Sequence, residues 1–255
     1  MAEVKINGKK FFYETTGKGD PVILIHGWLC THKTVKIIAD YLSEYFTVYN
    51  VDVVGFGNSE LPDEPMNSDQ YGDWLKKFIK ALDIKNPILI GHSHGGRMIL
   101  NYAYRNLGPC KKIVLIDSAG IKKKRKLKYY IKVGTFKFLK GLYKILPKTE
   151  GFRNMNQRTI NFFGSADYKN SPEVLRKSMS IFINEDFTNN LNKIKTPTLI
   201  VWGANDTATP LWQGELMNMK IKNSKLVVIE NGDHYSFLRD WNQFSKALDN
   251  FLIKK

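Results

Sequence analysis

The stretch that decides the fold is Ile88-Leu89-Ile90-Gly91-His92-Ser93-His94-Gly95-Gly96-Arg97-Met98. An apolar run typical of a buried strand ends in Gly-x-Ser-x-Gly, and apolar residues at helical spacing continue to Tyr104. Gly91 and Gly95 stand two residues before and after Ser93, where a Cβ would collide in a sharp strand-to-helix turn. We therefore predict that Ser93 lies on a strained turn at a helix N-terminus, placed to attack a carbonyl carbon.

The pentapeptide alone arises by chance in roughly one chain in ten of this length, so a glycine-rich turn with an incidental serine is the alternative. The strand before Ser93 and the helix after it favour the nucleophile.

Asp206 and His234 are the candidates that would activate this serine. Each follows an apolar run typical of a buried strand, at 198–203 and 226–230 respectively. A serine needs a base to take its proton and an acid to orient that base, and these residues supply both. The alternatives are a helix-capping role for Asp206, a surface turn for His234, and Asp117, at the end of the run 113–116, as the acid.

With these motifs the chain resembles α/β-hydrolase-fold serine hydrolases of the esterase and lipase type, over about residues 11–251. The chain order Ser, Asp, His is that of the family. His26-Gly27-Trp28 after the run 22–25 and the turn Asp52-Val53-Val54-Gly55-Phe56-Gly57-Asn58-Ser59 also match. The resemblance implies an oxyanion hole formed by the backbone N–H groups of Trp28 and His94, each contributing about 3 kcal/mol. We expect the turn at 52–59 to shape the floor of the site, and His26 to hydrogen-bond the loops beneath it.

The rest of the chain predicts an α/β fold, with a mainly parallel twisted sheet covered by helices on both faces. We expect a hairpin over 3–15 that turns at Asn7-Gly8, and strands near 21–26, 46–52, 86–91, 111–117, 197–203 and 225–231. The expected helices lie near 33–45, 68–82, 94–107, 210–219 and 236–253. Residues 1–117 and 192–255 would form the core, and residues 118–191 a helical cap inserted in it.

The predicted cap carries most of the excess positive charge. Between Ser118 and Thr149 there is no acidic residue but there are eleven basic ones, which leaves +4 of the formal +15 for the rest of the chain (Lys122, Lys123, Lys124, Arg125, Lys126, Lys128, Lys132, Lys137, Lys140, Lys144 and Lys148). This pattern predicts a lid whose basic face meets an anionic partner or a membrane surface, and the alternative is a merely solvated face. A second cap helix is expected to start at Ser171-Pro172-Glu173, with Ser171 as N-cap. Phe162 and Phe163, together with Trp28, are expected to contact the substrate.

Single residues narrow the activity that the resemblance implies. Family dehalogenases and epoxide hydrolases carry aspartate where this chain has Ser93, and C–C hydrolases carry a glycine-rich stretch where it has Trp28-Leu29-Cys30-Thr31. We therefore expect a small-molecule carboxylic ester or thioester as substrate. The alternatives are C–C bond, lactone, perhydrolase or acyltransferase chemistry with the same triad, and a catalytically silent binding protein.

Other features predict no further ligand. His92-x-His94 spans a turn that would direct the two rings apart, so we expect no metal, and no cofactor motif is present. Basic charge without a recognition motif argues against nucleic acid. Two cysteines, a polar N-terminus and no apolar run of the ~20 residues that cross a bilayer favour a cytoplasmic protein. Nothing in the sequence specifies the oligomeric state.

Overall fold

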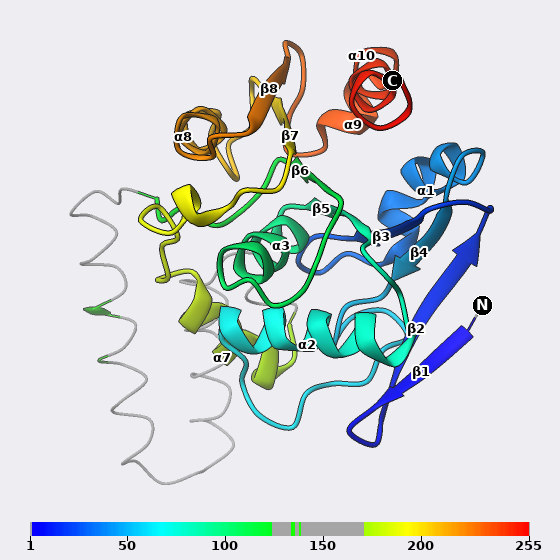
Figure 1. Cartoon of the computed structure of the whole chain (residues 1–255). Helices are drawn as coiled ribbons and strands as arrows, with labels where there is room; N and C mark the ends of the chain where they lie inside the picture. Colours follow the sequence, from blue (N-terminus) through cyan, green and yellow to red (C-terminus); the bar gives the residue numbers. More distant parts are fainter. Residues whose placement is uncertain (1, 124–133, 136–137, 139–170, 255) are drawn as a thin grey trace, which may run out of the picture.

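A computed structural model describes residues 2–123, 134–135, 138 and 171–254 of the chain (Figure 1). Within these residues an eight-stranded sheet has the order β1-β2-β4-β3-β5-β6-β7-β8. The strands β1 and β2 pair in antiparallel fashion, as do β2 and β4, whereas all other neighbours are parallel. The strands are β1 (Ala2–Ile6), β2 (Lys9–Thr16), β3 (Pro21–Ile25), β4 (Thr47–Val51), β5 (Ile88–His92), β6 (Lys112–Ile116), β7 (Thr198–Gly203) and β8 (Ser224–Ile229).

Helices cover both faces of this sheet, and alternating side chains of the strands explain why. In β3, Ile23 and Ile25 pack into one core, whereas Val22 and Leu24 pack into the other. Figure 1 shows α2, α3 and α8 on one side of the sheet and α1 and α10 on the other. The helices are α1 (Lys36–Leu42), α2 (Ser68–Ala81), α3 (His94–Tyr104), α7 (Glu173–Phe182), α8 (Trp212–Lys220), α9 (Ser236–Arg239) and α10 (Trp241–Leu248). Shorter helical turns are η1 (His32–Val35), η2 (Leu191–Lys193) and η3 (Asp249–Ile253).

The predicted fold class is confirmed, and the elements differ from prediction mainly at helix ends. The single helix expected over 236–253 is divided into α9, α10 and η3. The break falls at Asp240, which has non-helical backbone angles (φ −139°, ψ 85°) and accepts a hydrogen bond from the Gln243 N–H as the N-cap of α10. The N-cap of α7 is Pro172 and not Ser171, because Pro172 keeps a non-helical ψ of 155°.

The returning part of the predicted cap packs on the core. The Met66 N–H donates to Ser178 of α7 (2.8 Å), and the Phe187 N–H donates to the Gly120 carbonyl (2.9 Å). Glu185 accepts from the Ser68 N–H at the start of α2 (3.2 Å). Phe162, Phe163 and the basic residues from Lys124 to Lys148 lie outside the described residues, so their predicted roles stay predictions. Among the described helices, none combines the length and apolar character needed to cross a membrane.

Candidate active site

Ser93 lies on a strained turn between β5 and α3. Its backbone angles are φ 50° and ψ −110°, a combination that residues other than glycine rarely adopt. The two flanking glycines are required by close packing. A Cβ on Gly91 would lie 2.5 Å from the Gly95 carbonyl carbon, and a Cβ on Gly95 would lie 2.3 Å from the Ile25 carbonyl oxygen. The strand-turn-helix predicted from the sequence is therefore present, and the two glycines are needed because there is no room for a Cβ at either position.

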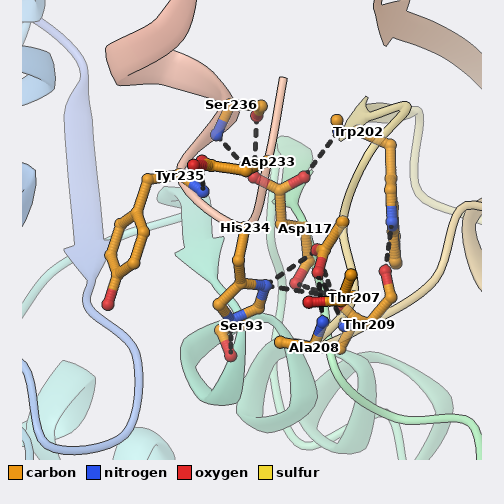
Figure 2. Close-up of polar contacts among 12 residues, drawn as sticks. Ser93, Asp117, Trp202, Thr207, Ala208, Thr209, Asp233, His234, Tyr235 and Ser236 are labelled. Carbon is orange, nitrogen blue, oxygen red and sulfur yellow. Dashed lines mark hydrogen bonds and ion pairs between the residues drawn. The ribbon is translucent and has the colours of Figure 1, made fainter. Parts of the chain in front are cut away.

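His234 lies between Ser93 and Asp206, and Figure 2 shows its ring next to Ser93. Its Nε2 is 3.0 Å from the Ser93 Oγ, and its Nδ1 is 2.8 Å from Asp206 Oδ2. Because the carboxylate can only accept, Nδ1 carries the proton and Nε2 is left to accept from the serine hydroxyl. The structure thus brings His234 together with Asp206, 28 positions away along the chain, and with Ser93, 141 positions away.

Asp206 is held as an anion by its own turn. Oδ1 accepts from the backbone N–H groups of Ala208 (2.7 Å) and Thr209 (2.8 Å), and Oδ2 accepts from the Thr209 hydroxyl (2.7 Å). Burial acts to raise the pKa of Asp206, but the hydrogen bond and charge of His234 and the bonds from Thr209 outweigh it and lower the pKa. The indole N–H of buried Trp202 donates to the Thr209 carbonyl (2.7 Å) and fixes the turn from behind. The capping-type role and the contact with His234 therefore coexist in Asp206.

Asp117 does not take the place of Asp206. Its Oδ1 accepts from the Gly203 N–H (2.8 Å), and its Oδ2 accepts from the N–H (3.1 Å) and hydroxyl (2.7 Å) of Ser236. No hydrogen bond of the described residues joins its carboxylate to His234.

The two backbone N–H groups predicted to form an oxyanion hole are those of Trp28 and His94. Leu29 has a positive φ of 55°, and the Cys30 N–H donates to the Gly27 carbonyl (3.2 Å), so the chain turns tightly at Trp28. Within the described residues, no hydrogen bond occupies the N–H of Trp28 or that of His94. His94 is the first residue of α3, so its N–H is one of the unpaired donors of a helix start.

The loops beneath these donors are joined by His26 and Asp52. His26 Nδ1 donates to the Gly27 carbonyl (2.7 Å), and Nε2 accepts from the Val53 N–H (3.1 Å). Burial lowers the pKa of His26 to about 4, so the ring is neutral. Asp52 accepts from the N–H groups of His32 (2.7 Å) and Asn58 (2.9 Å), which makes the turn at 52–59 structural.

His92 and His94 have separate surroundings, as expected for the two sides of the turn. His92 Nε2 donates to the His234 carbonyl (2.7 Å), and burial lowers the pKa of His92 to about 3. The ring of His94 packs between Tyr71 (4.7 Å between centroids) and Phe182 (4.7 Å). In the part of the chain that the structure describes, no three side chains group as metal ligands. The contacts of His92 and Thr209 with the site were not predicted, because no local motif distinguishes them.

Comparisons with known proteins agree with this fold. Residues 20–240 match the model of the alpha/beta hydrolase fold family. The chain is 28% identical to the AB hydrolase superfamily protein YisY of Bacillus subtilis (strain 168), over 94% of each chain. It is 26% identical to the 2-hydroxy-6-oxo-6-(2'-aminophenyl)hexa-2,4-dienoic acid hydrolase of Metapseudomonas resinovorans, over 99% of this chain and 90% of that one.

Among solved structures, the bromoperoxidase from Bacillus anthracis is 27% identical and covers 99% of each chain, with a TM-score of 0.76. The chain therefore belongs to the alpha/beta hydrolase fold family and is a hydrolase.

Proposed function

We propose that the protein is a serine hydrolase that cleaves carboxylic esters or thioesters through an acyl-enzyme. The observation that carries the proposal is the pair of contacts made by one imidazole, 3.0 Å to Ser93 Oγ and 2.8 Å to Asp206 Oδ2. A strained serine at a helix start, a neutral base and an anionic acid are the three parts that acyl transfer needs.

In the first half-reaction His234 accepts the hydroxyl proton as Ser93 Oγ attacks the carbonyl carbon. Asp206 keeps Nδ1 protonated and stabilises the imidazolium that forms. The N–H groups of Trp28 and His94 donate to the oxyanion of the tetrahedral intermediate. The imidazolium then returns its proton to the leaving alkoxide or thiolate, and the acyl group stays on Ser93.

In the second half-reaction a water molecule replaces the leaving group. His234 takes a proton from the water, and the oxygen attacks the acyl carbon. Collapse of the second intermediate releases the carboxylic acid and restores the Ser93 hydroxyl. Both halves use the same base and the same two N–H donors, so no further catalytic group is required.

An aromatic wall supports an acyl group of apolar character. Trp28 packs against Phe56 (4.7 Å between ring centroids), His94 (5.1 Å) and Phe182 (4.9 Å), directly beside the proposed oxyanion donors. Phe162 and Phe163 remain the further candidates for this wall.

C–C bond hydrolysis is the second candidate, because one relative at 26% identity is named as a hydrolase of a dienoic acid. The sequence Trp28-Leu29-Cys30-Thr31 argues against it. C–C hydrolases of this family share a glycine-rich stretch at this place, and these four residues contain no glycine. Ester cleavage is therefore preferred.

A panel of p-nitrophenyl esters from acetate to palmitate tests the proposal. We expect turnover with an initial burst of p-nitrophenol equal to the enzyme concentration wherever deacylation is slower than acylation, and no turnover by Ser93→Ala. Absence of ester turnover, combined with hydrolysis of a 2-hydroxy-6-oxo-dienoic acid, would make C–C hydrolysis the activity.

A further inference from the structure

Hydrogen bonds to Asp117 join the loop that carries Asp206 to the loop that carries His234. Asp117 directly follows β6, and its side chain is fully buried. Gly203, which donates to Oδ1, is the last residue of β7 and lies three residues before Asp206. Ser236, which donates twice to Oδ2, begins α9 two residues after His234. Figure 2 shows the bonds between Asp117 and Ser236 as dashed lines.

The main chain of Asp117 makes a second link to the same place. The Thr209 hydroxyl lies 2.9 Å from the Asp117 carbonyl oxygen, 2.7 Å from Asp206 Oδ2 and 3.2 Å from His234 Nδ1. The Thr209 hydroxyl therefore lies between the backbone of Asp117, the Asp206 carboxylate and the imidazole of His234.

This arrangement costs stability. Asp117 has a positive φ of 45°, a strained conformation for a residue that is not glycine. Burial raises the pKa of Asp117 to about 6, although the bonds from Ser236 and Gly203 act to lower it. Among the described residues it forms no ion pair. Because a strained, buried carboxylate without a cation destabilises the fold, a gain in stability does not explain its presence. Its hydrogen bonds instead connect it to the loops of Asp206 and His234.

We propose that Asp117 is a positioning residue that, as a carboxylate, holds the Asp206 and His234 loops at the spacing the imidazole needs. The proposal rests on the serine mechanism above. Three donors point at its two oxygens, and only the ionised group can accept from all of them. Protonation turns one of the two acceptor oxygens into a donor. The bond from the Gly203 N–H or the bond from the Ser236 N–H is then lost, and the Asp206 and His234 loops can separate.

The titratable groups that face Asp117 come from the two catalytic loops. Asp206 follows β7, and its charge acts to raise the pKa of Asp117. His234 reaches it only through the Thr209 hydroxyl. Two protons must therefore be absent for full activity, one from the imidazole and one from the Asp117 carboxyl.

The rate of fluorophosphonate labelling of Ser93, measured against pH, tests this proposal. The probe needs the serine and its base but no knowledge of the natural substrate. In the wild type we expect the logarithm of the rate constant to fall with a slope of about two below pH 6, because both groups must be deprotonated. In Asp117→Asn the slope should be about one, and the rate at pH 8 about 10²-fold lower, as for a displaced catalytic group. Each sample is returned to pH 8 to verify that lost activity recovers.

Asp240→Asn is the control. Asp240 is also a carboxylate that accepts a backbone N–H, that of Gln243 at the start of α10, but its side chain makes no hydrogen bond to the loops of Asp206 or His234 within the described residues. This variant should keep the slope of about two.

Ser236→Ala decides the question if Asp117→Asn does not fold. Loss of the hydroxyl donor should raise the pKa of Asp117 further and move the steep part of the profile to higher pH. A slope of one in the wild type, or a profile unchanged in Ser236→Ala, would overturn the proposal. Failure of the proposed function would instead appear as no labelling of Ser93 at any pH.

Discussion

Asp206 uses one side chain both to hold its own turn and to bind the imidazole of His234. One carboxylate oxygen accepts from the N–H groups of Ala208 and Thr209, and the other accepts from His234. Because the turn already fixes the carboxylate, the imidazole is oriented at little further entropic cost. The same bonds lower the pKa of Asp206 and so favour its carboxylate form.

Asp206→Asn should lower kcat by about 10⁴-fold, because an amide N–H facing Nδ1 stabilises the wrong imidazole tautomer. We expect KM to change little, since Asp206 does not face the substrate. Initial rates on an ester of the panel give both constants. Asp233→Asn is the control: this neighbour of His234 faces Arg239 (2.8 Å), and its loss should leave kcat near the wild-type value. Equal effects of the two variants would show that Asp206 is not the orienting acid.

At the scale of elements, α7, a helix of the predicted cap, packs next to the site. Phe182, at its last turn, packs against the rings of Trp28, Tyr71 and His94 and lies under the guanidinium of Arg97 (5.5 Å). Arg97 in turn approaches Glu185 (3.8 Å), just beyond α7. This helix of the predicted cap is thus held beside Ser93 by aromatic packing and a charge pair.

Phe182→Ala should lower the free energy of unfolding by about 3–5 kcal/mol, because it removes a buried ring from this cluster. It should also raise KM for esters with apolar acyl groups, since Trp28 loses its neighbour. Urea unfolding and a KM series measure the two effects. Ile181→Ala, one residue earlier and 41% exposed, should change stability by about 0.5 kcal/mol or less. A mild Phe182→Ala would contradict the packing role of α7.

The sequence was sufficient to predict most of these elements and the residues at their ends. Continuous apolar runs made the central strands recognisable in the sequence, and Ser93, Asp206 and His234 follow strands whose carboxyl ends share one edge. The break at Asp240 was missed because the apolar spacing continues across it. The bonds of Asp117 to residues 86 and 119 positions away depend on strand order, which no local pattern contains.

Across the whole molecule, buried neutral histidines make the fold sensitive to acid. Burial lowers the pKa of His26 to about 4 and that of His92 to about 3, and it lowers the pKa of His94 well below its ordinary value. In the unfolded chain a histidine titrates near its ordinary value of 6.5. The unfolded state therefore binds more protons below that pH, so stability falls as pH falls. Asp117, whose pKa is raised, acts in the opposite direction between its ordinary 3.8 and about 6.

The free energy of unfolding should therefore decrease from about pH 6.5 to pH 4, with a slope of up to about 4 kcal/mol per pH unit from three histidines before the opposing contribution. Urea titrations at half-unit intervals measure this slope. His92→Gln retains a donor for the His234 carbonyl without a titrating ring, so its stability should fall less steeply. Stability that is constant over this range would show that the histidines are not buried as neutral groups.

The central claim is that Ser93 is the nucleophile, and mass spectrometry of the fluorophosphonate-treated protein tests it most directly. We predict one adduct per chain, located on the peptide that contains Ser93, and none in Ser93→Ala that retains its fold by circular dichroism. The Ser93 Oγ is the hydroxyl placed 3.0 Å from the imidazole of His234, and this contact is what gives it reactivity. Labelling of another serine, or an adduct that persists in Ser93→Ala, would contradict the claim.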